Sequence, residues 1–274
     1  MPRFHEWILL AYFWYTAAIA PFFLPHPGHA VLLALAVTAF LAVTAQFNYA
    51  RDWAPLALIL TAYREMDWFA PLQRDYHFEL GWIEWDRVLF YRWGFQGAAE
   101  VLGPVGPAFL EFSYLLVYAT GPFVVAALYF AHRRDRIEPV LTVFLLGTLL
   151  SYALFPFFPS VPPRELFGAS DLPHYVSPFR RLNLFLVNGY GIHSSVFPSA
   201  HVSSAFSGAW ALMLFVPERK WLGRGMLIYA VSVALAVIYG RYHYAVDSLA
   251  GFGVSLMALA VGLAIRRVKM LRVK

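Results

Sequence analysis

Seven stretches without Asp, Glu, Lys or Arg constrain this sequence of 274 residues more than any other feature. They are Trp7–Leu24, Ala30–Ala50, Phe112–Ala131, Val140–Pro163, Val202–Pro217, Gly225–Gly240 and Ser248–Ile265. Several have the roughly 18 to 20 residues that a helix needs to cross a hydrocarbon core about 30 Å thick, and the shorter ones can be extended. The pattern predicts an all-α, polytopic membrane helix bundle of six to seven spans.

The composition supports the same fold class. Charged residues make up 14% of the chain, against roughly 25% in an average soluble domain. The hydrophobic share of 60% excludes a disordered chain, and the absence of cysteine excludes disulfides and thiolate metal sites. No metal-ligand spacing such as HExxH occurs among the nine histidines, so we expect neither a metal nor another cofactor.

The charges are divided unequally between the two faces on which alternating spans would place their connections. One face collects eleven basic residues and three acids, a net charge of +8; the other carries ten arginines and thirteen acids, a net charge of −3. The positive-inside rule makes the first face cytoplasmic and, with seven spans, places the N-terminus outside. The overall net charge of +5 therefore reflects orientation in the bilayer, and we expect no nucleic-acid partner.

Composition divides the chain into four segments. We expect N-terminal spans in 1–50, an extracytoplasmic interfacial cap in 51–106, a membrane helical core in 107–265 and a basic cytoplasmic tail in 266–274. The cap holds five of the nine tryptophans among charged residues at near-helical spacing, which is typical of helices lying in the headgroup layer. The alternative is an eighth span around Pro55–Ala62, a stretch too short to cross unaided.

Polar residues at span ends on the extracytoplasmic face are the candidates for a functional site. His243 and Asp247 lie four residues apart, so on a helix the carboxylate can bond one imidazole nitrogen and leave the other as a base or nucleophile. An ion pair that only anchors the last span is the alternative interpretation.

A second group is Pro198-Ser199-Ala200-His201, at the start of the fifth span. With Pro198 as the first helical residue, the amides from Ser199 to His201 would point out of a helix N-terminus, where a phosphate binds readily. His201 could then protonate a leaving oxygen, although a helix start with an incidental histidine is the alternative. Small residues recur from Ala200 at four-residue intervals, which allows close packing that could bring His201 near His243.

Two arginines complete the candidate site. Arg164 follows two prolines, and Arg241 lies two residues before His243. Guanidinium groups match phosphate oxygens bidentately, although snorkelling is the ordinary explanation of one interfacial arginine. Two arginines, two histidines and one aspartate on a single face are poorly explained by independent accidents, so the pattern predicts a phosphate site.

At these residues the sequence resembles the type 2 phosphatidic acid phosphatase superfamily. The family's second motif, usually P-S-G-H, is present at 198–201 with Ala200 in place of glycine. Its third motif, S-R-x5-H-x3-D, keeps His243 and Asp247, but Val237 occupies the arginine position. The first motif, K-x6-R-P, is absent; Pro162-Pro163-Arg164 takes its place in chain order, as in the inositol phosphorylceramide synthase-like branch, which 63–90 also resembles.

The resemblance, which covers about residues 62–265, implies metal-independent phosphoryl transfer in two steps. His243 would attack phosphorus and form a phosphohistidine, Asp247 would orient the imidazole, and His201 would protonate the leaving oxygen. The phosphate would be bound by Ser199, Arg164 and Arg241, with Arg180 or Arg181 as further sources of the missing arginine's charge. The branch resemblance adds two cap residues near the substrate, Arg64 and Asp86.

The substrate implied by this resemblance is a membrane lipid with a phosphate headgroup. Our first hypothesis is a lipid phosphotransferase of the inositol phosphorylceramide synthase type, with an alcohol as acceptor. The second is a lipid phosphate phosphatase that acts on phosphatidate, phosphatidylglycerol phosphate or a polyprenyl diphosphate. A third, a transporter or membrane scaffold, is disfavoured because no ionisable residue lies securely inside a predicted span.

Overall fold

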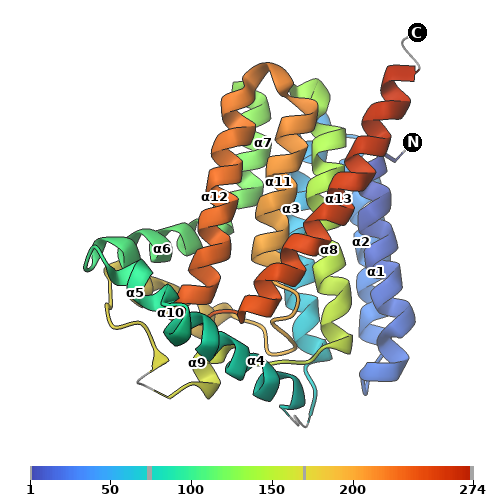
Figure 1. Cartoon of the computed structure of the whole chain (residues 1–274). Helices are drawn as coiled ribbons and strands as arrows, with labels where there is room; N and C mark the ends of the chain where they lie inside the picture. Colours follow the sequence, from blue (N-terminus) through green and yellow to red (C-terminus); the bar gives the residue numbers. More distant parts are fainter. Residues whose placement is uncertain (1, 73–75, 169–170, 272–274) are drawn as a thin grey trace.

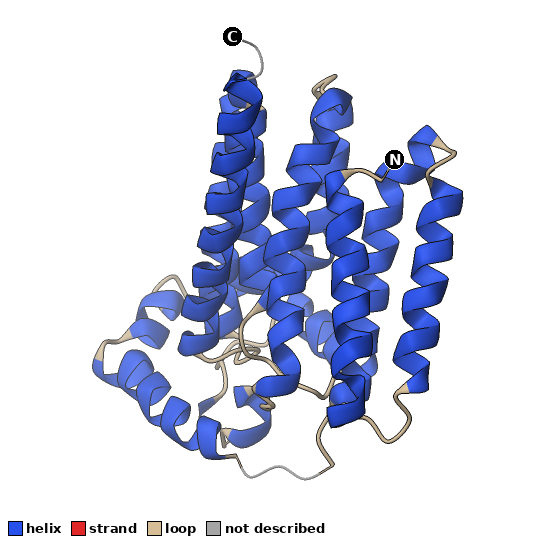
Figure 2. Ribbon diagram, turned by 90° about the vertical axis from the view of Figure 1, so that its right-hand side faces the viewer, coloured by secondary structure: helices blue, strands red, loops and turns tan. Residues whose placement is uncertain are grey.

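Every regular element in the described parts of the chain, residues 2–72, 76–168 and 171–271, is helical in this computed structural model (Figures 1 and 2). The helices that run through the bundle are α1 (Phe4–Phe23), α2 (Gly28–Thr44), α3 (Asn48–Glu65), α7 (Thr120–Phe130), α8 (Ile137–Leu154), α11 (Ala200–Phe215), α12 (Lys220–Tyr239) and α13 (Ala245–Leu271). The other α-helices are α4 (His77–Arg87), α5 (Phe95–Glu100), α6 (Val105–Leu115), α9 (Pro163–Leu166) and α10 (Pro178–Tyr190).

Short 3₁₀ and π-helical segments, wound more tightly or more widely than an α-helix, join several of these helices. Met66–Phe69, Leu116–Ala119, Arg134–Arg136, Phe155–Phe157 and Pro217–Arg219 are 3₁₀ helices, and Val88–Arg92 is a π-helix. Within the described residues, five helical segments are long and apolar enough to cross a membrane: Phe4–Phe23, Val105–Phe130, Arg134–Phe157, Pro217–Tyr239 and Ala245–Val268. The shorter apolar helices α2 and α11 lie among them, so the predicted all-α membrane bundle is confirmed.

Helix α3 changes the course of the chain through the bundle. It takes in residues 51–65, which the sequence analysis placed in the cap, and packs against α1, α2, α7 and α8 (Figure 1). This extra traverse brings both chain termini to the same end of the bundle, so the expectation of termini at opposite ends is wrong. At that end the Phe4 amide donates to Glu138 of α8 at 3.0 Å, and Arg3 pairs with Asp52 of α3 at 2.6 Å. Residues 272–274 of the predicted basic tail lie outside the described residues.

Helix α11 occupies the centre of the bundle, where it packs against α7, α8, α12 and α13. Small residues permit these close contacts: Ser203 donates from its hydroxyl to the Gly147 carbonyl of α8 at 2.5 Å, and Gly251 of α13 lies against the Ser199 carbonyl with no room for a Cβ atom. Stripes of small residues allow helix backbones to approach in a membrane. The N-termini of α11 and α13 are thereby held side by side.

Helices α4, α5, α9 and α10, hereafter the surface helices, lie at the end of the bundle opposite the termini (Figure 1). α4 is fastened to the chain turns at that end by two buried carboxylates. Glu79 accepts from the Val161 amide at 2.8 Å, and Asp86 accepts from the Ala245 amide at the start of α13 at 3.0 Å. The other predicted segment boundaries remain predictions.

Candidate active site

The two histidines singled out from the sequence lie together at the surface-helix end of the bundle. His201 is in the first turn of α11, and His243 is in the turn between α12 and α13. Their ring centroids are 5.7 Å apart and the rings are nearly perpendicular, at 82°. Both line a cavity of about 60 Å³. The expectation that close packing of α11 brings His201 near His243 is therefore confirmed.

The imidazole of His243 has a defined orientation. Its Nδ1 atom is 2.8 Å from the Val196 carbonyl oxygen and 3.4 Å from Oδ2 of Asp247. Because a carbonyl oxygen can only accept, Nδ1 must carry the proton, and this N–H group donates a hydrogen bond to the Val196 carbonyl. The other ring nitrogen, Nε2, is then the one with a lone pair, as a nucleophile requires.

Asp247 contacts the His243 ring but does not accept the hydrogen bond from its Nδ1 atom. Its Oδ2 accepts from the Tyr244 amide at 2.9 Å, which holds the carboxylate at the start of α13. At 3.4 Å from Nδ1 it makes an ion-pair contact with the ring, while the Val196 carbonyl takes the hydrogen bond that the sequence analysis assigned to the carboxylate. The carboxylate can therefore balance positive charge on the imidazole.

Burial sets the protonation state of His243. It lowers the pKa of the imidazole to about 3; the hydrogen bond to Val196 acts in the opposite direction, and the positive charge of Arg164 lowers the pKa further. The ring is therefore neutral near pH 7, the form in which Nε2 can attack.

The start of α11 differs in one detail from the sequence-based expectation. Ser199, not Pro198, directly precedes the helix: its hydroxyl accepts from the Val202 amide at 3.4 Å as the helix N-cap. Its own amide donates to the Asp247 carbonyl at 3.0 Å. Among the residues expected to bind phosphate through backbone amides, Ala200 and His201 are therefore the ones whose amides belong to the first turn, where a helix leaves its donors unpaired.

Arg164 is the predicted arginine that faces the cavity. It lies on α9, its amide donates to the Arg241 carbonyl at 3.0 Å, and its side chain lines the cavity together with both histidines. The side chain is 17% exposed, and its guanidinium carbon is 6.0 Å from the ring centroid of Tyr242. A cation at this position can neutralise a phosphate placed between the two histidines.

Arg241 points away from the cavity, toward the surface helices. Its guanidinium carbon is 3.2 Å from the ring centroid of Phe90 and 4.7 Å from that of Phe167, and its Nε donates to the Asp171 carbonyl at 2.8 Å. Burial lowers the pKa of this guanidinium to about 10, so it stays charged near pH 7. The predicted role of Arg241 in phosphate binding is not supported by this placement.

The four further residues predicted near the substrate lie outside the small cavity. Arg180 is buried and pairs with Glu111 at 2.6 Å, and Arg181 is exposed on the same helix. Arg64 is exposed and donates to the Tyr190 carbonyl at 2.9 Å. Asp86 accepts from the start of α13, and burial raises the pKa of its carboxyl to about 7.

Tyrosines that the sequence analysis did not single out form much of the cavity wall. The rings of Tyr114 and Tyr242 stack at 3.8 Å with 6° between their planes, and Tyr114 meets His201 edge-on at 5.5 Å. Tyr63 and Tyr152 also line the cavity. Tyr242 is marked in the sequence by its position next to His243, and Tyr63 by its place at the start of the 63–90 resemblance. Nothing distinguishes Tyr114 and Tyr152 among the sixteen tyrosines of the chain.

A larger apolar cavity of about 640 Å³ adjoins the small one. It lies between α3, α7, α8, α10 and α11, and the two cavities share Tyr63, Tyr152, Ala200 and His201 in their linings. Its walls are mostly aliphatic and aromatic, with Leu56, Ile59, Leu60, Val117, Phe144 and Leu186 among them. The site thus combines a compact polar end with an apolar chamber, the shape of an amphiphile.

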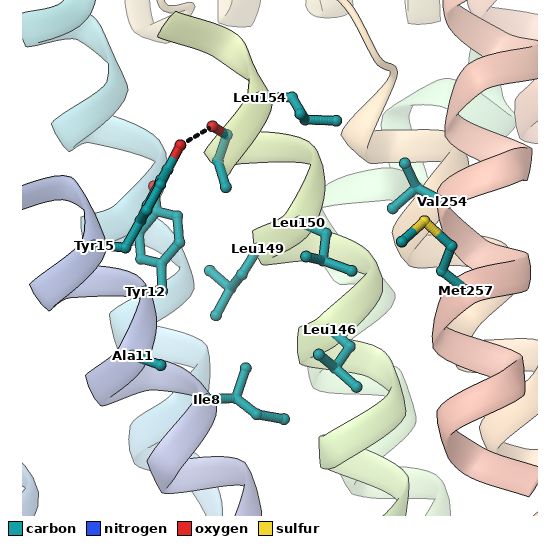
Figure 3. Close-up of a pocket in the computed structure, with 11 residues that line it drawn as sticks. Ile8, Ala11, Tyr12, Tyr15, Leu146, Leu149, Leu150, Leu154, Val254 and Met257 are labelled. Atoms are coloured by element: carbon teal, nitrogen blue, oxygen red, sulfur yellow. Dashed lines mark hydrogen bonds between the residues drawn. The ribbon is translucent and has the colours of Figure 1, made fainter. Parts of the chain in front are cut away.

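A third cavity, of about 410 Å³, lies between α1, α8 and α13 (Figure 3). Its described lining is apolar apart from Tyr12 and Tyr15, and Tyr15 donates its hydroxyl to the Ala153 carbonyl at 2.7 Å. Without charged side chains it offers nothing to bind or activate a phosphate. No group of three or more His, Cys, Asp or Glu among the described residues is arranged to hold a metal ion; the absence of a metal from the reaction remains a prediction.

The chain is similar to known proteins in the region that holds this site. Residues 83–261 match the family model described as the PAP2 superfamily. A Dictyostelium discoideum protein described as a PA-phosphatase related-family protein is 24% identical over 199 residues, which cover 61% of this chain. The same residues cover 34% of that relative, so the match spans about a third of its length. No solved structure matches the chain.

Proposed function

Because the chain belongs to the PAP2 superfamily, and is thus a membrane phosphatase or phosphotransferase, we propose that it moves the phospho-headgroup of a lipid to an alcohol acceptor through a phosphohistidine. This is the reaction type of the inositol phosphorylceramide synthases. The observation that carries the proposal is the meeting of His201, His243 and Arg164 in one small cavity beside an apolar chamber.

Each of these side chains has one role in the reaction. Nε2 of His243 attacks phosphorus, the leaving oxygen takes a proton from His201, and Asp247 balances the charge that appears on the phosphorylated imidazole. His201 must therefore be protonated when the phospho-lipid is bound, a state that the substrate's own negative charge favours. Arg164 and the first amides of α11 neutralise the phosphoryl oxygens.

In the second step the acceptor takes the phosphoryl group from His243. His201, now neutral, removes the proton from the acceptor hydroxyl as the new oxygen–phosphorus bond forms and the phosphorus–nitrogen bond breaks. His243 returns to its neutral form, so both histidines are restored and no external acid or base is consumed.

The two adjoining cavities support a lipid as substrate. A headgroup phosphate fits the polar end near His201, and the apolar chamber between α3 and α11 offers about 640 Å³ for hydrocarbon chains. Burial of each methylene contributes about 0.8 kcal/mol, so chains in this chamber add directly to affinity.

An alcohol acceptor is supported by the enclosure of the site. Trp82 of α4 stacks on Phe197 at 5.3 Å, directly before the start of α11, and α4 is held there by the Glu79 and Asp86 hydrogen bonds. We propose that this packing limits the access of water to the nearby cavity. The similarity to a Dictyostelium PA-phosphatase related-family protein favours the second candidate function, a lipid phosphate phosphatase, in which water is the acceptor.

We further propose that the site faces away from the cytoplasm. The basic connections at 132–139 and 217–220 lie at the end of the bundle with the termini, and the cavity lies at the other end. The traverse of α3 adds Arg3, Arg51, Glu6 and Asp52 to the basic end, and these charges cancel, so its net charge stays at +8. The positive-inside rule assigns that end to the cytoplasm.

The test uses the purified protein in mixed detergent micelles with phosphate-labelled phosphatidylinositol or phosphatidate, each with and without ceramide or diacylglycerol. Transfer predicts a labelled new lipid that forms only when an acceptor is present. Acceptor-independent release of soluble label at full rate would establish the phosphatase instead. Turnover that continues unchanged in both His243→Ala and His201→Ala would overturn both functions.

A further inference from the structure

Glu111 of α6 is a buried carboxylate with an unusually complete set of partners. Oε1 accepts from Nη1 of Arg180 at 2.6 Å. Oε2 accepts from Nδ2 of Asn183 at 2.8 Å and from the Tyr242 hydroxyl at 2.7 Å. Glu111 is 1% exposed, and all three partners are buried. A buried charge with this many donors is held in one geometry, because the loss of any donor leaves a desolvated oxygen.

Two of these partners tie Glu111 to the turn that carries His243. Tyr242 immediately precedes His243, and Nη1 of Arg180 also donates to the Gly240 carbonyl at 3.2 Å. The turn is therefore fixed on both sides of Arg241 by groups from α6 and α10. The amides of Tyr242 and His243 both donate to the Val237 carbonyl, each at 3.0 Å, which leaves the turn little freedom of its own.

The same network reaches the second histidine through stacked rings. Tyr242 lies parallel to Tyr114 at 3.8 Å, and Tyr114 meets the ring of His201 edge-on at 5.5 Å. Moving the Tyr242 ring thus displaces a neighbour of each histidine. Misplacement of reacting groups by about 1 Å can cost on the order of 100-fold in rate.

We infer that Glu111 and Arg180 form a buried clamp that sets the distance between His201 and His243 through the Tyr242 and Tyr114 rings. The inference rests on the proposed function of His243. Glu111, Arg180 and Tyr242 are positioning residues: the clamp acts on the geometry of the histidines and transfers no proton or phosphoryl group.

The test compares Tyr242→Phe with the matched variant Tyr239→Phe. Each change removes one buried hydroxyl that donates to a carboxylate, Glu111 for Tyr242 and Glu100 for Tyr239 at 2.8 Å, and keeps the ring. The probes are orthovanadate, which mimics the trigonal phosphorus of the transition state bound to a nucleophile, and inorganic phosphate, which mimics the ground state. Affinities and Tm are measured on the full chain in detergent, so no lipid substrate has to be identified.

For Tyr242→Phe we expect vanadate affinity to fall about 10-fold while phosphate affinity changes less than about 2-fold. Tyr239→Phe should show the same small change in Tm with both affinities retained. Glu111→Gln should resemble Tyr242→Phe, and the double variant should lose no more than the more damaged single variant, because the two residues act in series.

Equal weakening of both anions in Tyr242→Phe, or vanadate affinity at the wild-type level, would overturn the clamp. So would the same selective loss in Tyr239→Phe, since that would show a general effect of losing a buried hydroxyl. His243→Ala separates this failure from failure of the proposed function: vanadate binding retained in His243→Ala contradicts the nucleophile, whatever Tyr242→Phe shows.

Discussion

Arg164 and Arg241 lie on two segments joined by one backbone hydrogen bond, yet their side chains have opposite surroundings. Arg164 lines the cavity with the two histidines, whereas Arg241 is 1% exposed between Phe90 and Phe167. The backbone at Arg241 is left-handed, with φ of 61°, and consecutive side chains of its turn leave in different directions. Closeness in sequence to His243 therefore does not place a charge in the cavity.

This difference divides the region into a cavity side, with His201, His243 and Arg164, and a cover side, with Arg241, Asp86 and the surface helices. Substitutions on the cavity side should remove chemistry at unchanged stability. Substitutions on the cover side should change stability, or its dependence on pH, while activity is largely kept.

The largest effect is expected from the histidines. His243→Ala removes the nucleophile and should lower kcat by about 10⁴-fold or more, and His201→Ala should lower it by about 10²- to 10⁴-fold. Steady-state turnover of the labelled lipid and Tm measured together would check this. His26→Ala, at an exposed site in the turn between α1 and α2, is the control and should match wild type. Turnover at the wild-type level in folded His243→Ala, or an equal loss in His26→Ala, would contradict the assignment.

The second effect tests the arginine comparison directly. Arg164→Gln should lower kcat/KM by about 10²- to 10³-fold, because a neutral amide cannot balance the transferring phosphoryl group. Arg241→Met keeps an apolar stem between Phe90 and Phe167 and should leave kcat/KM within about 3-fold. Kinetics of both purified variants decide the matter: the reverse ranking would place Arg241, not Arg164, at the phosphate.

A smaller effect is expected in the apolar chamber. Ile59→Trp on α3 fills part of the space next to the cavity and should raise KM about 10-fold for a lipid with long acyl chains, since each excluded methylene loses about 0.8 kcal/mol. A short-chain analogue should be turned over normally. Leu32→Trp, at an exposed position of α2, provides the control. Equal effects on long and short chains would show that the chamber does not hold the substrate's tails.

The smallest effect concerns Asp86 on the cover side. Its pKa is about 7 in the fold, against an ordinary value of 3.8, because burial penalises the carboxylate. As the pH rises from about 4 to 7 the unfolded chain releases this proton first, so the free energy of unfolding falls over that interval. Asp86→Asn keeps an oxygen for the Ala245 amide and cannot ionise.

The Asp86→Asn variant should therefore lose less stability than wild type between about pH 4 and pH 7 and should be the more stable of the two at pH 8. Tm measured across this range checks the sign. Parallel curves for variant and wild type would show that Asp86 does not titrate in the fold, and a sharp loss of turnover would move it to the cavity side.

Periodicity and motif spacing were sufficient to predict the bundle and the histidine pair. Apolar windows mark membrane helices because a helix must be apolar over its whole length to cross the hydrocarbon core. His201 lies in the first turn of α11 and His243 lies just before α13, as the two motifs predicted. The traverse by α3 was predicted only as the alternative of an eighth span around Pro55–Ala62, because Arg51, Asp52, Arg64 and Glu65 at its ends dilute its apolar centre. Arg51, Asp52 and Arg64 pair with other charged residues at the two ends of the helix, as between Arg51 and Glu6 at 2.5 Å, which a linear pattern does not reveal.

The direction of individual side chains could not be predicted from the sequence either. The sequence places Arg241 beside His243, but the direction of its guanidinium depends on contacts with Phe90 and Phe167, which are distant in the sequence. Likewise Arg180, a predicted source of charge for the phosphate, pairs with Glu111, which lies 69 residues away along the chain. Contacts of this separation depend on the packing of α6 against α10, which no local pattern encodes.

The central claim, that His243 carries the phosphoryl group, is tested most directly by trapping the intermediate. The full chain is mixed with phosphate-labelled lipid, quenched within one turnover in alkali, where phosphohistidine survives, and mapped by peptide mass spectrometry. We predict one phospho-headgroup, which is a bare phosphoryl group when phosphatidate is the donor, on the peptide that contains His243, lost in His243→Ala and longer-lived in wild type when acceptor is withheld. Label on the His201 peptide, or full turnover without any labelled histidine, would contradict the account.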